Sequence, residues 1–199
     1  MSTIDVTRPV MSQLTFDPVE HVYTFAGVRV PSVTQVIGAV LPGWQASEWH
    51  KQRGPATHLA CKFLDGICLA WSTVAPEIEG RVRAWAKFRA QFLAGVVLNE
   101  TPMVHEGCRY AGTLDRLFEN GVLADLKSTT EPQARLQLGG YSLMAKANQF
   151  EVGRAVAVEL HDNGTYSTLW LDRHELRRAE QAFLAVLTVF GFMQAHGLK

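Results

Sequence analysis

The sequence has few cysteines, no net charge and no long apolar run, and each of these absences excludes a class of protein. The three cysteines, Cys61, Cys68 and Cys108, form no CxxC pair, so they supply neither a zinc site nor a disulfide framework. Three thiolates are also too few for an iron–sulfur cluster that needs four. Lys plus Arg and Asp plus Glu each total 19, so binding to a polyanion requires a local basic patch.

Targeting signals and membrane spans are missing as well. No apolar run approaches the roughly 18 residues needed to cross a bilayer. The first residues, MSTIDVTRPVMSQL, lack the charged and apolar regions of a secretory signal. Unpaired cysteines are typical of a reducing compartment. We therefore expect a soluble cytoplasmic protein with no membrane contact.

The sequence does contain enough apolar residues for a substantial core. Its 199 residues are 47% apolar, which suits one domain or a domain with a small appendage. Residues 1–29 are expected to form a lead-in with short strands at 14–16, 21–25 and 28–30, because Asp17-Pro18 and Ala26-Gly27 favour turns.

Residues 30–199 alternate between helical and strand periodicity. Ser32 is expected to cap a helix that ends at Pro42-Gly43, and Gly54-Pro55 is expected to separate the next two helices. The further helices are expected at about 45–52, 55–70, 77–94, 133–148 and 172–196, and the strands at 96–105, 109–118, 122–127, 155–160 and 166–171. This order predicts an α/β fold, with a central mixed β-sheet flanked by helices in a single domain.

The segment 112–128, GTLDRLFENGVLADLKS, places charged residues in strands that are otherwise mostly apolar. Asp125 and Lys127 are two residues apart, so they share one face of their strand. A two-residue turn at Asn120-Gly121 would put Asp115 on the other face. A three-residue loop with a left-handed Gly121 would instead put Asp115 directly opposite Asp125. Both turns are compatible with the sequence.

The second register would give this hairpin a chemical role. Facing carboxylates have Cβ atoms roughly 4.5–5.5 Å apart and repel each other. A bound Mg²⁺ or Mn²⁺ would turn that repulsion into coordination, because hard cations prefer oxygen ligands. Lys127 could then place its ammonium near a phosphate oxygen or an attacking water. The alternative is a solvated polar stripe on an edge hairpin.

The helix after the hairpin carries Gln137 and Tyr141 four residues apart, so these side chains share one face. Gly139 and Gly140 lie between them, and glycines within a helix cost roughly 1 kcal/mol each relative to Ala. Their presence indicates close approach of either a nucleic-acid backbone or the sheet. The sequence leaves both explanations open.

Upstream of the hairpin, His58 follows a Gly-Pro pair near a helix start, and Glu100 precedes the hairpin in a strand. A structural histidine and a solvated strand end are their ordinary explanations, although Glu100 could add a carboxylate to the site. A local patch of cations could contact phosphates, and a solvated helix face is the alternative. The candidate cations are Arg81, Arg83, Lys87 and Arg89 on helix 77–94, with Arg135 and Lys146 on or near helix 133–148.

A series of short motifs, in order, resembles the PD-(D/E)XK nuclease superfamily, in its RecB-like branch and especially its compact phage-encoded members. The matching segments are VPSVTQVI (30–37), RGPATH (53–58), LNETPMV (98–104) with YAGTLD (110–115), LADLKST (123–129) and QLGGY (137–141). They extend over about residues 30–145. One departure follows the histidine, where many members have a Glu and this sequence has Leu59, Ala60, Cys61 and Lys62. The departure argues against a second metal held by that helix.

The resemblance implies a metal site at the splayed hairpin. His58, Asp115 and Asp125 would be metal ligands, with the backbone carbonyl of Leu126 as a further ligand. Glu100 would assist this site or a second ion. The expected cation is Mg²⁺ or Mn²⁺.

The resemblance also assigns Lys127 as the catalytic lysine, and it implies a metal-dependent deoxyribonuclease in a bacterial or phage-infected host cell. An exonuclease in phage-type recombination is our first hypothesis. The alternatives are a structure-specific or restriction-like endonuclease and a catalytically silent binding module. The expected partner is DNA; a single-strand annealing or recombination protein and further copies of the chain are candidate partners. The expected DNA contacts are Ser128, Gln137, Tyr141, Arg135, Arg81 and Lys87.

Overall fold

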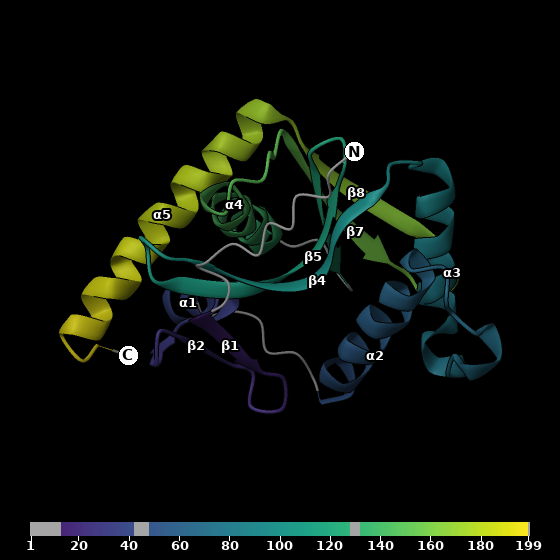
Figure 1. Cartoon of the computed structure of the whole chain (residues 1–199), viewed down its shortest axis with the longest axis horizontal. Coiled ribbons are helices and arrows are strands. Elements are labelled where there is room, and N and C mark those ends of the chain that lie inside the picture. Colours follow the sequence, from purple (N-terminus) through teal and green to yellow (C-terminus); the bar gives the residue numbers. More distant parts are fainter. Residues whose placement is uncertain (1–12, 42–47, 128–131, 199) are drawn as a thin grey trace.

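The computed structural model of the chain describes residues 13–41, 48–127 and 132–198 (Figure 1). Five strands form one sheet in the order β4-β5-β6-β7-β8. The β6–β7 pair is parallel and the other neighbours are antiparallel. The strands are β4 (Val96–His105), β5 (Tyr110–Phe118), β6 (Val122–Lys127), β7 (Arg154–Leu160) and β8 (Tyr166–Leu171). Helices flank this sheet, so the expected α/β fold with a central mixed sheet is confirmed.

Two hydrophobic clusters attach helices to the sheet. The first joins α1 (Val33–Val40), α4 (Pro132–Ala147) and α5 (Arg173–Ala195) to residues such as Leu123. The second joins α2 (Glu48–Asp65) and α3 (Pro76–Gln91) to residues such as Val122 and Ala124. A short 3₁₀ helix, η2 (Trp71–Thr73), connects α2 to α3. Because neighbouring residues of β6 belong to different clusters, its apolar run is explained by a strand covered on both faces.

The N-terminal strands are confirmed as a separate antiparallel sheet. It contains β1 (Leu14–Asp17), β2 (Val22–Phe25) and β3 (Val28–Val30). Its buried residues, among them Tyr23 and Phe25, pack against Val104 of β4 and Ala111 of β5. The small sheet therefore lies against the first two strands of the large one. The expected division between residues 29 and 30 stays a prediction.

The expected helix starts and ends are partly correct. Ser32 caps α1 through a complete capping box with Gln35, as its sequence context indicates. The predicted break at Gly54-Pro55 is wrong, because α2 continues through Pro55. Proline lacks an amide proton and usually ends a helix. Here α2 packs against α3 and β4, and tertiary packing of this kind supplies most of the stability of a helix in a protein. The predicted end at Pro42-Gly43 lies outside the described residues.

Close contact between α4 and α5 explains the two glycines within α4. A Cβ at Gly139 would lie 2.4 Å from the carbonyl oxygen of Ala179. A Cβ at Gly140 would lie 2.9 Å from the Phe183 ring. Of the two explanations left open, structural packing is the one observed, although the partner is a helix and not the sheet.

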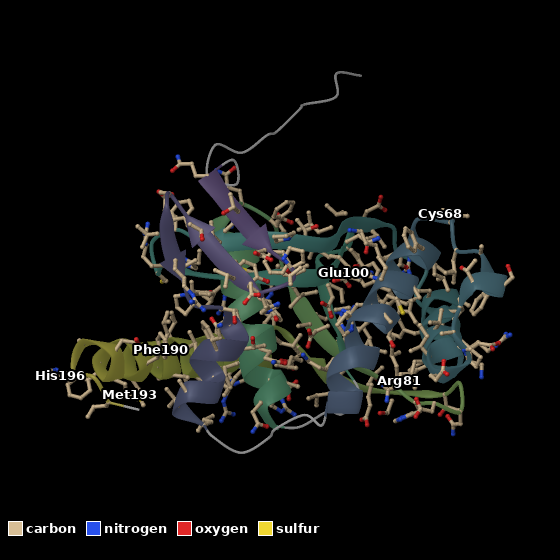
Figure 2. The ribbon with its side chains drawn as sticks, turned by 90° about the horizontal axis from the view of Figure 1, so that it is seen from below. Cys68, Arg81, Glu100, Phe190, Met193 and His196 are labelled. Carbon is tan, nitrogen blue, oxygen red and sulfur yellow. The ribbon has the colours of Figure 1, made fainter. Side chains whose placement is uncertain are left out.

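The second half of α5 extends away from the body of the protein, as Figure 2 shows at Phe190, Met193 and His196. Several large apolar side chains of this half are exposed, including Val189 at 46% and Phe192 at 58%. The helix has no charged residue after Glu180. None of the helices among the described residues combines the length and the hydropathy that a membrane span requires.

Candidate active site

The β5–β6 turn decides the register that the sequence left open. Gly121 has a φ of 71°, and its amide donates to the carbonyl of Phe118 at 2.9 Å. Leu117 pairs with Leu123, and Arg116 pairs with Ala124. The three-residue loop is therefore the one formed. At the next position of this register, Asp115 is level with Asp125.

Glu100 of β4 lies level with Asp115 and Asp125 across the neighbouring strands. In the β4–β5 ladder Asn99 pairs with Arg116 and Thr101 pairs with Leu114, which places Glu100 level with Asp115. Glu100 has a φ of 48°, a left-handed conformation that is costly within a strand. Such strained residues are concentrated at functional sites. Acidic residues from three neighbouring strands are thus level with one another.

Helix α2 adds His58 to this row. Its Nδ1 lies 3.1 Å from Oε1 of Glu100 and 3.4 Å from Oδ1 of Asp115. The ligand atoms of these three residues all lie within 4.8 Å of one another. Adjacent ligands of an octahedral Mg²⁺, with bonds of about 2.1 Å, are about 3 Å apart. One nitrogen and two carboxylate oxygens at this spacing fit a hard divalent cation.

The charges within the cluster are strongly coupled. Burial by itself lowers the pKa of His58, but Asp115 and Glu100 outweigh it and raise the pKa to about 10. Burial raises the pKa of Asp115, yet the His58 imidazolium, Lys127 and the Leu126 amide together lower it to about 2. Without a cation, a proton on His58 therefore supplies the positive charge that the two carboxylates require.

Asp125 and Lys127 form an ion pair beside the cluster. Lys127 Nζ lies 2.7 Å from Oδ2 of Asp125, and both side chains are largely buried. Burial and the neighbouring Asp115 carboxylate outweigh Lys127 and raise the pKa of Asp125 to about 7. Asp125 is not part of the three-residue ligand group, whereas Glu100, expected only to assist, belongs to it. Coordination of one cation by both Asp115 and Asp125 stays a prediction.

The backbone of β6 fixes the orientation of Asp115. The amide of Leu126 donates to Asp115 Oδ2 at 2.7 Å, which leaves Oδ1 directed toward His58. The Asp115 side chain therefore links β5 to β6 beyond their last backbone pair, Arg116 with Ala124. Ligation by the Leu126 carbonyl stays a prediction.

A buried ion network behind the cluster was not foreseen from the sequence. Arg116, with a fully buried side chain, donates to Glu100 Oε1 at 2.8 Å and to Asp65 Oδ2 at 2.5 Å. Asp65 also accepts from Arg89 at 2.8 Å and from Trp85 Nε1 at 3.0 Å. A signal available in the sequence was an arginine between Asp115 and Leu117 in a mostly apolar strand. The network thus holds the same Glu100 oxygen that lies near His58.

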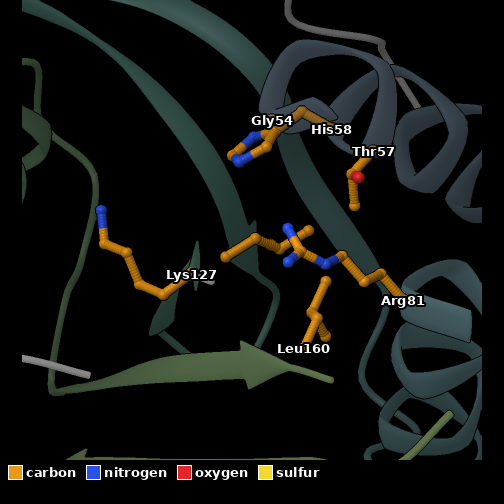
Figure 3. A pocket seen from close by; sticks show the side chains of 7 residues that line it. Gly54, Thr57, His58, Arg81, Lys127 and Leu160 are labelled. Atoms are coloured by element: carbon orange, nitrogen blue, oxygen red, sulfur yellow. The ribbon is translucent and has the colours of Figure 1, made fainter. Parts of the chain in front are cut away.

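Two cavities meet at His58. The smaller, about 130 Å³, is lined by Thr57, Arg81, Lys127 and Leu160 in addition to His58. In Figure 3 the His58 ring and the Arg81 guanidinium point into the same space, and Lys127 lies across from them. The larger cavity, about 490 Å³, includes the whole cluster in its lining and extends to the β1–β2 hairpin.

Two of the basic residues of α3 that we expected to contact phosphates are paired within the protein. Arg81 has a side chain that is 9% exposed, donates to Asp162 at 2.7 Å and lines the smaller cavity. Lys87 donates to the carbonyl of Gly164 at 2.7 Å. Arg135 of α4 is 45% exposed and lies 3.5 Å from Glu175. Contacts of these cations with DNA stay predictions, and Ser128 lies outside the described residues.

Tyr141 lies at the site and Gln137 lies one turn before it on α4. Tyr141 is buried and lines the larger cavity with Asp115. Burial raises its pKa well above the usual value, so the hydroxyl stays protonated. A Cβ at Gly112 would lie 2.9 Å from Tyr141 Cε1, so the glycine of the GTLD motif makes room for this ring. Gln137 is partly buried, and its DNA contact stays a prediction.

Comparison with solved structures finds an alkaline exonuclease, LHK-Exo from Laribacter hongkongensis, at 16% identity and a TM-score of 0.40. The match covers 83% of this chain and 92% of that chain. LHK-Exo in complex with dAMP matches at 14% identity and a TM-score of 0.41, over 84% of this chain and 93% of that one. No family model matches the sequence, and no curated protein matches it.

Proposed function

We propose that this protein is a metal-dependent deoxyribonuclease that hydrolyses phosphodiester bonds. The observation that carries the proposal is the group of His58, Glu100 and Asp115, whose ligand atoms lie within 4.8 Å of one another. The Lys127–Asp125 ion pair lies beside it. This donor set suits Mg²⁺ or Mn²⁺. When bound, such a cation lowers the pKa of water and neutralises charge on phosphoryl oxygens.

The side chains of the cluster hold the cation in this proposal, and each has a separate support. The Leu126 amide fixes Asp115, and Arg116 fixes Glu100. His58 must lose its proton before its ring nitrogen can act as a ligand. Because its pKa is lowered to about 2, the Asp115 carboxylate is already ionised and can attract the cation before that proton leaves.

Lys127 supplies the remaining positive charge. The Lys127 side chain is 20% exposed, and its ammonium is held by Asp125. The residue lines the smaller cavity together with Arg81. A phosphate between the two cavities could receive a charge-assisted hydrogen bond from Lys127. In this role the lysine stabilises charge on the phosphoryl oxygens or orients the attacking water, and no covalent intermediate forms.

Within this activity we favour an exonuclease that acts on DNA ends in phage-type recombination or DNA processing, as the motif resemblance implies. A recombination or annealing protein would then be a functional partner. The exposed apolar side chains on the second half of α5 support association with a protein surface, for which further copies of this chain are the first candidate. Size-exclusion chromatography with light scattering tests this association.

The central experiment is digestion of linear duplex DNA in Mn²⁺, with 5′- and 3′-labelled substrates in parallel. The proposal expects metal-dependent release of labelled nucleotides. Asp115→Asn and Lys127→Met should each abolish cleavage while the fold is retained. Glu151→Gln, which removes a carboxylate on an exposed loop, is the matched control and should cleave normally. Unchanged cleavage by Lys127→Met would refute the role of this lysine.

Two further measurements separate the alternatives. Cleavage of covalently closed circles would identify an endonuclease, since an exonuclease requires an end. A catalytically silent module would show neither cleavage nor calorimetric heat for Mn²⁺ binding. Metal binding without cleavage would support the metal site and exclude the proposed hydrolysis of phosphodiester bonds.

A further inference from the structure

The larger cavity has an aromatic wall that the proposed cleavage chemistry does not use. Phe16 and Tyr23 of the β1–β2 hairpin stack with ring centroids 4.5 Å apart and an interplanar angle of 20°. The His21 ring is nearly perpendicular to both of these rings, at centroid distances of 5.4 and 5.6 Å. Phe16, His21 and Tyr23 all line the cavity. We call these three residues the aromatic wall.

The aromatic wall is held in place by polar contacts at both ends. Asp17 Oδ1 accepts from the amides of Val19 and Glu20, which closes the β1–β2 turn. His21 follows with a φ of 51°, a conformation that costs energy for a residue other than glycine. The Tyr23 hydroxyl bonds to Thr113 Oγ1 at 2.8 Å. Because Thr113 is two residues from Asp115, the wall is fixed relative to the cluster.

The other surfaces of the cavity complement a nucleotide. Helix α2 contributes Leu59, next to His58, and Lys62, one helical turn beyond His58. Glu100 and Asp115 of the cluster also line the cavity. A volume of about 490 Å³ is within the range that holds one small ligand, roughly 300–1,000 Å³. It suits one nucleotide and not a length of duplex.

Tyr23 is only 1% exposed and supports Phe16 from behind, so the accessible rings of the aromatic wall are those of Phe16 and His21. We propose that these two rings bind an unpaired nucleobase next to the scissile phosphate. The proposal rests on the proposed function and deepens it, because the substrate strand must then be single-stranded or unpaired at the site. Aromatic side chains bind bases by stacking, with little dependence on sequence, since every base has a π-face. Lys62 would contact a neighbouring phosphate. The expected substrates are single strands and frayed or unpaired ends.

Binding can be measured without cleavage and without metal. The probes are a tetranucleotide containing 2-aminopurine and the same tetranucleotide with an abasic position, titrated into the full chain in EDTA at constant salt. Stacking on an aromatic ring quenches 2-aminopurine fluorescence. The proposal expects quenching, and weaker binding of the abasic probe by roughly 5- to 150-fold, the effect of losing one stacked base.

Two variants test the wall, and one serves as the control. Phe16→Leu keeps an apolar side chain but removes the π-face, and it should weaken binding of the base-bearing probe while leaving binding of the abasic probe unchanged. His21→Asn changes an exposed side chain, and asparagine tolerates the left-handed backbone, so it should weaken stacking without unfolding the hairpin. Trp71→Leu removes an exposed aromatic ring of η2 that lines neither cavity and should bind like wild type.

The outcomes distinguish this proposal from the proposed function. Equal binding of both probes, or equal effects of Phe16→Leu and Trp71→Leu, would overturn the base site even if the protein cleaves DNA. Base-dependent binding that is sensitive to Phe16, in a protein that does not cleave, would support the base site and refute the nuclease. Displacement of the probe by an uncharged leucine-rich peptide but not by unlabelled tetranucleotide would assign the cavity to a peptide and overturn it.

Discussion

Replacing Arg116 with methionine should destabilise the fold strongly, because its side chain is fully buried between two carboxylates. Methionine keeps much of the volume but leaves Asp65 and Glu100 without their shared cation. Removing one partner of a buried ion pair costs about 3–5 kcal/mol. Asp65 retains Arg89 and Trp85 as donors, so we expect the lower end, about 3 kcal/mol.

Equilibrium unfolding in urea, followed by tryptophan fluorescence in EDTA, measures this loss. At about 2–4 °C per kcal/mol for a domain of this size, the melting temperature should also fall by about 6–12 °C. Arg83→Met is the matched control. Its ion pair with Glu79 is exposed, with side chains 58% and 40% accessible, so it should cost less than about 1 kcal/mol.

The comparison between the two arginine variants tests whether the buried network stabilises the fold. If Arg116→Met loses no more stability than Arg83→Met, the buried network does not stabilise the fold in the way that its geometry indicates. A double variant with Asp65→Asn adds a second check. Because Arg116 and Asp65 are in direct contact, the two effects should not be additive.

Three further predictions concern helix packing and the cation. Gly139→Ala should destabilise the fold by about 1–3 kcal/mol, because the new Cβ would meet the Ala179 carbonyl oxygen at 2.4 Å. Gly191→Ala, whose new Cβ would have nothing within 4 Å, should be neutral or stabilising, and urea titrations would compare the two variants. Calorimetry should show Mn²⁺ affinity rising about tenfold per pH unit between pH 6 and 8. The reason is that the His58 pKa of about 10 means that each bound ion displaces one proton from His58. A flat profile would show that His58 is not a ligand. In thermal scans, Mn²⁺ at 100 times its Kd should stabilise the wild type by about 2.7 kcal/mol, whereas Asp115→Asn should show no such gain; equal stabilisation of both would place the ion elsewhere.

The sequence determined the elements of the fold because local periodicity and turn chemistry are properties of short segments. The apolar run at 155–160 and the capping residue Ser32 each specify a local structure. The charged positions in 112–128 likewise predicted a candidate site at the hairpin before any tertiary contact was known. Even so, a one-residue difference in the turn left the face of Asp115 undetermined.

Tertiary structure decided what depends on contacts between distant segments. It fixed the hairpin register through Gly121 and brought His58 within 3.1 Å of Glu100, 42 residues away. It also carried α2 through Pro55 and buried Arg81 against a cavity. The free energy of these arrangements comes from packing and from the pairing of buried charges. Both depend on which segments meet in space, and the order of residues along one element does not contain that information.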